Sequence, residues 1–360
     1  MSTVLTVLPP REQYTDTHAG AISLLVSRLA QPGDIICGTG TRDAGTQGAS
    51  LPGGVFHRLR LTRWPFPRMF RYGLACLEAI RQYQPSLVEV HNRPDLAQFL
   101  SRFAPVRLIF HNDPRGMKGA RTPARRADLA RRVLVCAVSR WLAERFTEGS
   151  QDIRVEIQPN CLDLMQLPAP RERRPSVLFA GRVVSDKGAD AFVRAWGAVR
   201  GHFPGWDAVI MGADRFGADS PETPFLSELR PQAAAQGVRM TGYQPHEAVL
   251  DAMTSSSIVV VPSRWPEPFG MTALEAMGCG AAVIASPVGA LPDVVGDAAV
   301  LAVPDEPGAL EDALSCLMAD AELRVGLGQK ARRRAAQFGM EAARARLLDL
   351  RRAAVDARGR

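Results

Sequence analysis

The sequence predicts an α/β protein made of two domains, each built around a doubly wound parallel sheet. Short apolar strands alternate with helical segments along the whole chain, which is typical of βαβ units. The 360 residues are enough for two domains, and 46% of them are hydrophobic, so each domain can bury a large core. A proline-rich segment, residues 166–176, separates the two series of strands and predicts a linker.

The first predicted domain covers residues 1–165. A helix is expected from about His18 to Ala30, after a first strand. Strands are predicted at residues 4–8, 34–37, 55–61, 86–90, 107–110, 133–138 and 155–158. Polar residues directly follow two of these strands. In parallel sheets, the crevice beyond the carboxyl ends of the strands is where ligands bind.

The second predicted domain, residues 177–338, repeats this pattern. Strands are predicted at residues 177–180, 208–211, 259–262 and 282–285. A helix is predicted after the first of these strands. From Pro307 the pattern is helical to the end of the chain, with a break expected at Gly339.

The positive charge of the chain is concentrated in its first half. Residues 1–163 contain 22 Lys+Arg and 14 Asp+Glu, a balance of +8, whereas the whole chain has 44 and 37, a balance of +7. No helix-turn-helix, zinc or RNP pattern accompanies this excess, which argues against nucleic acid as a partner. Two interpretations stay open: a face attracted to anionic membrane lipid or an anionic glycolipid acceptor, or an arginine-rich solvated surface.

The six cysteines are dispersed and include no C-x-x-C pair. This spacing argues against a zinc site and a disulfide framework, and it fits a reducing compartment. The N-terminus lacks a basic segment followed by a long apolar one, and no apolar run approaches the ~18–20 residues of a membrane span. We therefore expect a cytoplasmic protein, whose membrane contact, if any, is peripheral on the inner face of the cytoplasmic membrane.

The stretch from residue 259 to 295 carries the strongest chemical pattern. It reads as strand, loop, helix, strand and loop. Glu267 lies in the first loop and Glu275 lies in the helix. A carboxylate just before a helix N-terminus can point into the ligand crevice. The helix start also leaves backbone N–H groups that can donate to ligand oxygens, namely those of Phe269, Gly270 and Met271.

These residues resemble a known family. The segment Glu267-Pro-Phe-Gly-Met-Thr-Ala-Leu-Glu275, with the Gly-Cys-Gly and Ser-Pro-Val-Gly stretches after it, is similar to the E-x7-E motif of retaining GT-B glycosyltransferases of family 4. The resemblance implies two Rossmann-like domains facing a central cleft, the first for the acceptor and the second for the nucleotide sugar. It implies that the last helix, residues 339–360, crosses back to the first domain. It also places Glu267 by the donor sugar and Glu275 on the nucleotide ribose.

Arg182 and Lys187 form a candidate site for a diphosphate. Both lie in the loop between the first strand and the first helix of the second predicted domain. Two fixed cations at the crevice suit a diphosphate, whose charge lies on closely spaced oxygens. The segment also matches the G-R-…-K-G pattern of the family, whose Arg and Lys hold the donor diphosphate.

Two histidines follow neighbouring strands of the first predicted domain. His111 comes after the later strand, where a histidine of related transferases touches the donor sugar, and the resemblance assigns this role to His111. A hydrogen-bonded structural histidine is the alternative. His91, Asn92 and Arg93 follow the earlier strand, and we expect them to bind the acceptor.

Three further positions are expected near ligands. Gly20, close to the first predicted helix, could allow the approach of a phosphate or the acceptor, although the chain lacks the Gly-Gly pair of many family members there. A glycine needed only for packing is the alternative. The order of segments in the second domain of the family places Gly242 and Tyr243 near the nucleobase.

The residues favour a reaction that needs neither metal nor cofactor. The chain contains no Asp-x-Asp motif to hold a metal beside the nucleotide sugar. Arg182, Lys187 and the amides near Gly270 can instead stabilise the leaving diphosphate. The resemblance implies retention of configuration, with Glu267 beside an oxocarbenium-like transition state.

The expected function is transfer of a hexosyl or N-acetylhexosaminyl group from a nucleotide sugar, UDP-linked first and GDP-linked second. The expected acceptor is a glycolipid or saccharide in lipopolysaccharide, capsule or exopolysaccharide synthesis, which rests on analogy. Two alternatives stay open: a sugar-nucleotide epimerase of the same architecture, and a non-catalytic sugar-nucleotide-binding protein.

Overall fold

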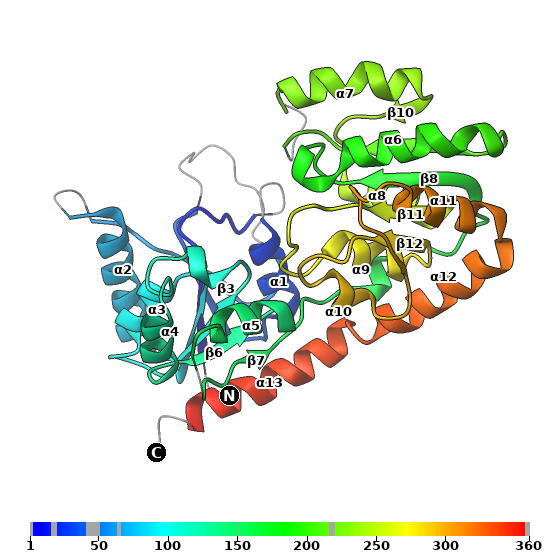
Figure 1. The fold of residues 1–360 in the computed structure, drawn as a ribbon. Coiled ribbons are helices and arrows are strands. Elements are labelled where there is room, and N and C mark those ends of the chain that lie inside the picture. The colour runs from blue at the N-terminus through cyan, green and yellow to red at the C-terminus, as the bar shows by residue number, and fades with distance from the viewer. Residues whose placement is uncertain are drawn as a thin grey trace. The chain divides into compact units, whose positions relative to one another are not determined.

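The computed structural model of the chain describes residues 3–15, 20–40, 51–62, 66–150, 152–215 and 220–356. The chain forms two compact units: Met1–Cys161 with Met340–Arg360, and Leu162–Gly339. Each unit contains one parallel sheet with helices on both faces (Figure 1). The first unit thus ends a few residues before the predicted position. The segment predicted as a linker, residues 166–176, belongs to the second unit, whose first strand already begins at Arg174.

The sheet of the first unit has the strand order β3-β2-β1-β4-β5-β6-β7, which reverses between β1 and β4 as in doubly wound folds. The strands are β1 (Val4–Val7), β2 (Ile35–Gly38), β3 (Val55–Arg58), β4 (Leu87–His91), β5 (Val106–Phe110), β6 (Leu134–Ala137) and β7 (Glu156–Ile157). The helices are α1 (Ala21–Leu29), α2 (Arg68–Tyr83), α3 (Pro94–Leu100), the turn η1 (Pro114–Gly116), α4 (Pro123–Ala130), α5 (Arg140–Thr147) and α13 (Met340–Asp356). The predicted helix start at His18 lies outside the described residues.

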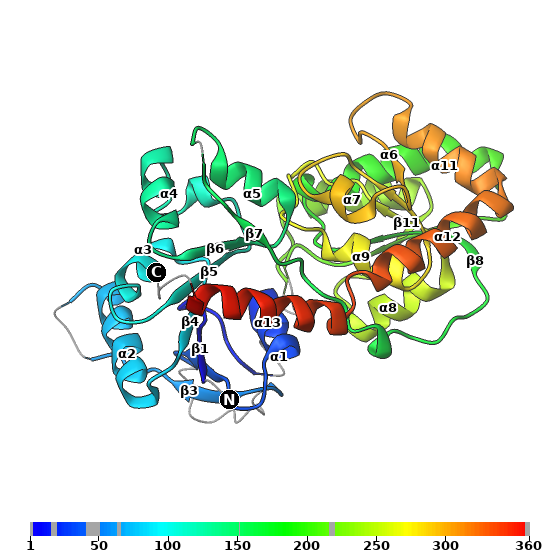
Figure 2. The same cartoon turned by 90° about the horizontal axis from the view of Figure 1, so that it is seen from below.

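Helices cover both faces of this sheet. Strand residues such as Leu5, Val88 and Leu108 belong to the core that the sheet forms with α2, α3, α4 and α5. Helices α1 and α13 pack together on the opposite face, where α13 lies over β4 and β5 (Figure 2). Because the central strands are buried on both faces, they read as continuous apolar runs rather than as alternating patterns.

The face under α1 and α13 contains a buried group of charges. Arg351 of α13 donates hydrogen bonds to both carboxylate oxygens of Glu89, at 3.1 and 2.8 Å, and it also pairs with Asp34 at 2.9 Å. Arg107 of β5 donates to Glu89 from the other side, at 2.5 Å. All four side chains are buried. Burial alone would raise the pKa of Glu89, but the two guanidinium groups lower it below its ordinary value.

The sheet of the second unit has the strand order β10-β9-β8-β11-β12-β13. The strands are β8 (Arg174–Ala180), β9 (Asp207–Met211), β10 (Val238–Met240), β11 (Ser256–Val261), β12 (Ala282–Ala285) and β13 (Val300–Leu301). The helices are η2 (Leu164–Gln166), η3 (Ser185–Lys187), α6 (Ala189–Val199), η4 (Arg200–His202), α7 (Pro224–Ala235), α8 (His246–Ser255), α9 (Met271–Gly278), α10 (Leu291–Val295), α11 (Ala309–Ala319) and α12 (Ala321–Ala336). The sequence alone does not predict α7, which contains Pro231, or the two-residue strand β13.

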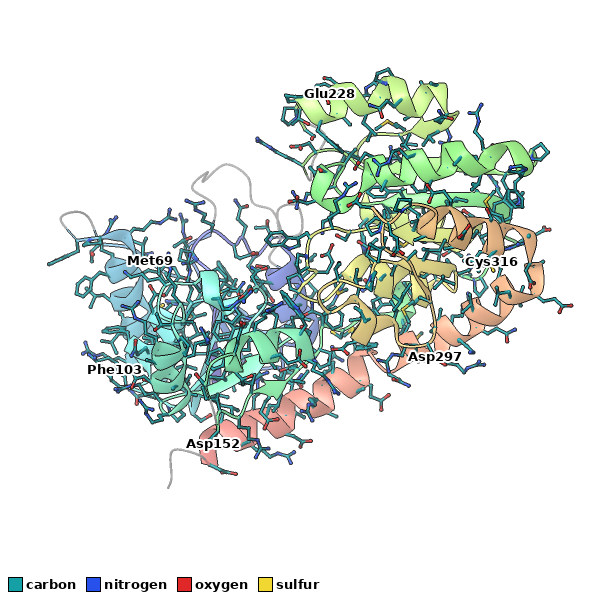
Figure 3. All side chains as sticks on the ribbon, in the orientation of Figure 1. Met69, Phe103, Asp152, Glu228, Asp297 and Cys316 are labelled. Carbon is teal, nitrogen blue, oxygen red and sulfur yellow. The ribbon has the colours of Figure 1, made fainter. Side chains whose placement is uncertain are left out.

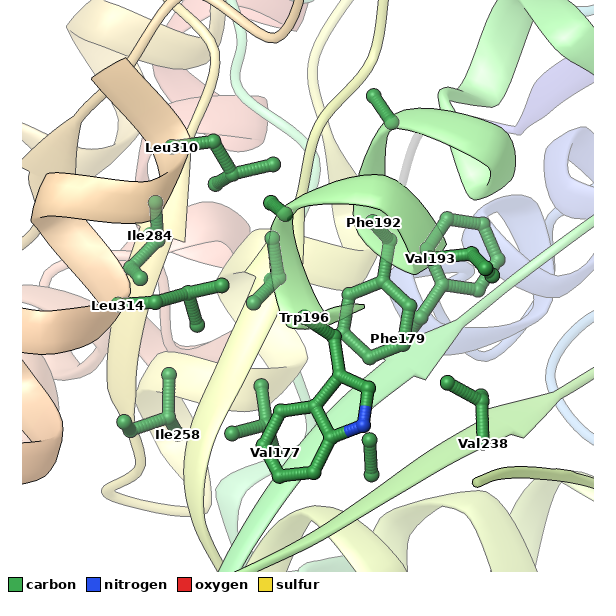
Figure 4. Packing of buried hydrophobic residues seen from close by; sticks show 14 of the residues in the cluster. Val177, Phe179, Phe192, Val193, Trp196, Val238, Ile258, Ile284, Leu310 and Leu314 are labelled. Carbon is green, nitrogen blue, oxygen red and sulfur yellow. The ribbon is translucent and has the colours of Figure 1, made fainter. Parts of the chain in front are cut away.

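The core of the second unit fixes β8 and β11, the strands that lead to the site described below. Phe192 and Trp196 of α6 pack on the β8 residues Val177 and Phe179 (Figure 4). The rings of Phe179 and Phe192 have centroids 5.9 Å apart. This apolar packing fixes the position of the strands. The loops at their carboxyl ends can therefore carry polar residues without contributing to the core.

Replacing Arg351 should destabilise the fold. We expect Arg351→Met to lower the free energy of unfolding by about 3–5 kcal/mol, because the buried carboxylates of Glu89 and Asp34 lose a cation. Arg352→Met is the control, since 74% of that side chain is exposed, and it should change stability by less than about 0.5 kcal/mol. Urea unfolding followed by circular dichroism measures both. Equal midpoints for the two variants would contradict the prediction.

Candidate functional site

The predicted donor-site residues gather at the carboxyl edge of the second sheet. Arg182 and Lys187 follow β8, Gly242 and Tyr243 follow β10, and the loop with Glu267 follows β11. Because the described strand pairs of this sheet are all parallel, their carboxyl ends lie at the same edge. Segments far apart in the sequence therefore meet at one edge of the second unit.

Lys187 and Glu267 form an ion pair at this edge. The Lys187 ammonium group donates a hydrogen bond to Glu267 Oε1. The Ser263 hydroxyl donates to the same oxygen at 2.7 Å. The Lys187 and Glu267 side chains are largely buried, with 24% and 13% of their surfaces exposed. Oε2 of Glu267 accepts no hydrogen bond from the residues that the structure describes, so it can accept one from a ligand hydroxyl.

Two glycines allow neighbouring loops to approach the segment from Pro262 to Glu267: Gly188 lies in the loop of Lys187, and Gly289 lies in the loop after β12. Gly188 has a φ of +72°, and a side chain there would overlap the Pro262 carbonyl at the end of β11. Gly289 has a φ of +60°, and a side chain there would overlap the backbone of Glu267. Glycine adopts both φ values without steric cost. A larger residue at either position would displace one of the two loops.

Helix α9 begins directly after the Glu267 loop and has no side-chain cap. Gly270 is its N-cap residue, with a φ of +101°, and Met271 is the first helical residue. Phe269 is buried, and its ring centroid lies 5.7 Å from that of Phe338. Phe269 therefore anchors the loop by its side chain, while the start of the helix supplies backbone N–H donors. These donors and the helix dipole favour an anion.

Glu275 pairs with a histidine that the sequence analysis missed. Nε2 of His246, the first residue of α8, lies 3.0 Å from Glu275 Oε1. The two residues lie 29 positions apart and in different helices, so periodicity could not reveal the contact. The sequence cue is that His246 follows Gly242 and Tyr243 closely in the chain, at the start of α8.

Arg182 has no counter-ion at this edge. In the ranges that the structure describes, its guanidinium group forms no hydrogen bond and no ion pair. Gly212, just after β9, donates its N–H to the Gly242 carbonyl at 2.9 Å and packs against the Gly181 carbonyl. This contact brings Gly242 close to the loop of Arg182. The neighbouring side chain, Tyr243, is 42% exposed.

In the first unit, His91 and His111 lie side by side at the ends of β4 and β5. His91 Nδ1 and His111 Nε2 share a hydrogen bond of 2.8 Å, and the ring centroids are 5.1 Å apart. The Asn92 side chain accepts the backbone N–H of His111 at 2.7 Å. Burial lowers the pKa of His91 to about 4 and the pKa of His111 well below its usual range. Both imidazoles are therefore neutral at pH 7.

The predicted acceptor residues of the first unit are less closely grouped than the predicted donor residues of the second unit. His91 is buried against His111, which leaves its ring little surface for an acceptor. Arg93 is the partly exposed N-cap residue of α3. Gly20 precedes α1, and a side chain there would meet the carboxylate end of the flexible Glu12 side chain. Acceptor binding by these residues stays a prediction.

Comparison with known proteins gives the family of the second unit. The family model described as glycosyl transferases group 1 matches residues 164–334. A D-inositol 3-phosphate glycosyltransferase of Corynebacterium jeikeium is 33% identical over 46% of this chain and 40% of its own length. A 2-deoxystreptamine N-acetyl-D-glucosaminyltransferase of Streptomyces fradiae is 29% identical over 66% of this chain and 67% of its own length. A lipopolysaccharide core biosynthesis mannosyltransferase of Rhizobium meliloti is 34% identical over 39% of this chain and 40% of its own length.

The chain thus matches between two fifths and two thirds of the length of these relatives. The Anabaena protein HepE, solved in complex with UDP and glucose, has a TM-score of 0.72 at 16% identity, and the match covers 97% of this chain and 99% of that one. An identity this low shows a shared fold. Residues 164–334 therefore belong to the glycosyl transferases group 1 family, and the chain has the GT-B fold that its sequence predicts.

Proposed function

We propose that this protein transfers a sugar from a nucleotide sugar to an acceptor. The ion pair of Lys187 and Glu267, beside the uncapped start of α9, is the observation that carries the proposal. The ion pair places a cation, which suits phosphate oxygens, in direct hydrogen-bond contact with a carboxylate, which suits sugar hydroxyls. The family of residues 164–334 supports the same reaction class.

In the proposed reaction, the bond between the sugar and a nucleoside diphosphate breaks, and the diphosphate leaves with added negative charge. This charge would be stabilised by Lys187, by the guanidinium group of Arg182 and by the backbone N–H groups at Gly270 and Met271. Donors that are fixed before the reaction are effective because they need not reorganise. Since these groups can do what a metal does elsewhere, metal independence is part of the proposal.

Glu267 would bind the sugar in the proposed reaction. Lys187 and Ser263 hold its Oε1, while Oε2 can accept a hydrogen bond from a sugar hydroxyl. An ionised carboxylate would also stabilise the positive charge of an oxocarbenium-like transition state. The proposal includes retention of configuration at the anomeric carbon, because the segment 267–275 resembles the corresponding motif of retaining enzymes. Glu275, held by His246, would bind the ribose.

His111 would take part in the proposed reaction as a neutral imidazole. Its Nε2 is engaged by His91, so Nδ1 is the ring nitrogen left for a substrate hydroxyl. A neutral ring can donate or accept a hydrogen bond without adding charge beside the sugar. This role fits an orienting group better than a general acid, because the lowered pKa disfavours the imidazolium.

The proposed donor is a UDP-hexose or UDP-N-acetylhexosamine, with GDP-mannose as the second choice. The complex of HepE with UDP and glucose supports a uridine nucleotide, and the name of the S. fradiae relative supports an N-acetylhexosamine. The proposed acceptor is a glycolipid or saccharide of the cell envelope, which the name of the R. meliloti relative supports. The other relatives are named for D-inositol 3-phosphate and 2-deoxystreptamine.

The proposed location is the cytoplasm, with peripheral contact to anionic membrane lipid. The basic first half of the chain supports this contact. On and before α2, the aromatic rings of Phe66 and Phe70 are about half exposed, close to Arg68. Within the described ranges, no helix has the length and apolar character needed to cross a membrane.

A panel of sugar nucleotides tests the function. Purified protein is incubated with each donor in EDTA, and release of nucleoside diphosphate is followed with and without a membrane glycolipid extract. Release from one donor, stimulated by the extract, would support metal-independent transfer. Conversion of a donor without diphosphate release would indicate an epimerase instead. Stabilisation by a nucleotide without turnover under any condition would indicate a binding protein.

Removing either member of the ion pair should abolish most of the activity. We expect Glu267→Gln and Lys187→Gln each to lower kcat by about 10²–10³-fold, the usual cost of losing one preorganised charge or donor. Glu228→Gln, on the outer helix α7, is the matched control and should leave kcat unchanged (Figure 3). Circular dichroism checks that the fold is retained. Activity of both site variants within twofold of the parent would contradict the proposal.

The histidine pair should stay neutral in mildly acidic solution. We expect ¹⁵N NMR to show uncharged His91 and His111 rings from pH 7.5 to about 5, whereas in urea all six histidines should titrate near 6.5. Because folding lowers these pKa values, the pair stabilises the fold above about pH 6.5. This stability is lost as the pH falls toward 4. Titration of both rings near 6.5 in the folded protein would refute their burial.

A further inference from the structure

Arg264, three residues before Glu267, uses every N–H donor of its guanidinium group. Nε and Nη2 donate to the Asp305 carboxylate at 2.7 and 2.6 Å. Nη1 and Nη2 donate to the Asp190 carboxylate at 2.7 and 2.8 Å, and Nη1 also donates to the Ser185 carbonyl at 2.7 Å. A guanidinium group has five N–H donors, so all of them are paired and the plane of the group is fixed.

The acceptors come from two separate segments of the chain, residues 185–190 and the loop that contains Asp305. Ser185 begins the turn η3, which contains Lys187, and Asp190 lies in the first turn of α6. Asp305 lies in the loop between β13 and α11. Arg264 itself belongs to the loop that carries Glu267. The side chain therefore connects three segments, and two of them supply the ion pair of the candidate site.

Bonds to one carbonyl reinforce this connection. The Asp186 carbonyl accepts the backbone N–H groups of Arg264 and Trp265, at 2.8 and 3.0 Å, and the Ser263 hydroxyl at 3.4 Å. Asp186 immediately precedes Lys187, and Ser263 also donates to Glu267. The peptide backbones on the two sides of the ion pair are thus held against each other.

Arg264 provides fixed geometry in addition to stability. The side chains of Arg264, Asp190 and Asp305 are 24%, 23% and 53% exposed, and they form a bidentate network rather than an isolated surface pair, which would contribute only about 0–1 kcal/mol. What a bidentate guanidinium–carboxylate pair does provide is a fixed geometry. Geometry matters at a reacting centre, where a displacement of about 1 Å can cost about 10²-fold in rate.

We propose that Arg264 is a positioning residue that holds the Lys187 and Glu267 loops at the separation required by a donor diphosphate and its sugar. We call the hydrogen bonds of Arg264 to Ser185, Asp190 and Asp305 the clamp. The catalytic effect of the clamp rests on the proposed function, whereas its existence does not. Lysine could not replace this arginine, because an ammonium group keeps the charge but has three donors and no planar fork.

The test compares Arg264→Ala and Arg264→Lys with Arg194→Ala. Arg194 is a matched control, because it donates to the same carboxylates, Asp190 at 2.7 Å and Asp305 at 3.4 Å, but to neither loop of the site. Three quantities are measured: hydrogen exchange of the segments 185–190 and 263–267, kcat and KM for the donor, and the melting temperature.

We expect both Arg264 variants to exchange the amides of residues 264 and 265 faster and to lose about 10–100-fold in kcat, with a melting temperature close to that of the parent protein. Guanidinium ion added at low concentration should restore part of kcat in Arg264→Ala, where it can occupy the vacated position, but not in Arg264→Lys. The Arg194→Ala variant should match the parent protein in exchange and kcat.

Unchanged exchange in Arg264→Ala would overturn the clamp, whether or not the protein is a transferase. Faster exchange with unchanged kcat would overturn the positioning role. A lost kcat that accompanies a large fall in melting temperature and does not respond to guanidinium ion would make Arg264 a stability residue, and would also overturn it. A parent protein inactive toward every donor would reject the proposed function, while the exchange data would still decide the clamp.

Discussion

The hydrogen bond between Lys187 and Glu267 is the contact on which the arrangement of the site depends. β8 and β11 are neighbours in a parallel sheet, so the loops after them leave from the same edge. Their side chains meet because Gly188 lets the loop after β8 come close to the end of β11. A cation and a carboxylate at this spacing can act on one small ligand, whereas a separation of a few ångströms would make them two independent surface charges.

The two units offer a ligand different chemistry. The edge of the second unit has fixed charges and a free helix N-terminus, which suit phosphate oxygens. The first unit buries Glu89 between two arginines and places two buried, neutral imidazoles, His91 and His111, at the ends of its strands. Neutral hydrogen-bonding groups suit hydroxyls better than phosphates.

The sequence predicted the fold and the local part of the site, because both depend on short patterns. Strand and helix periodicity, with the segments around Lys187 and Glu267, placed the main residues after the correct strands. Periodicity could not predict contacts between distant segments, such as His246 with Glu275 or Arg264 with Asp190. It also could not show that the His91 ring turns into the protein and pairs with His111.

The separation of Arg351 from Glu89 in the sequence has a consequence for the order of folding during synthesis. The last strand of the first unit ends at Ile157, but the arginine that completes the charge balance around Glu89 comes 194 residues later (351 − 157). At about 5–20 residues per second, a ribosome needs about 10–40 s to add those residues. During this interval the nascent first unit has its strands but lacks α13, and Glu89 has Arg107 as its cation. Synthesis of α13, rather than completion of the strands, is therefore the event that allows the first unit to close.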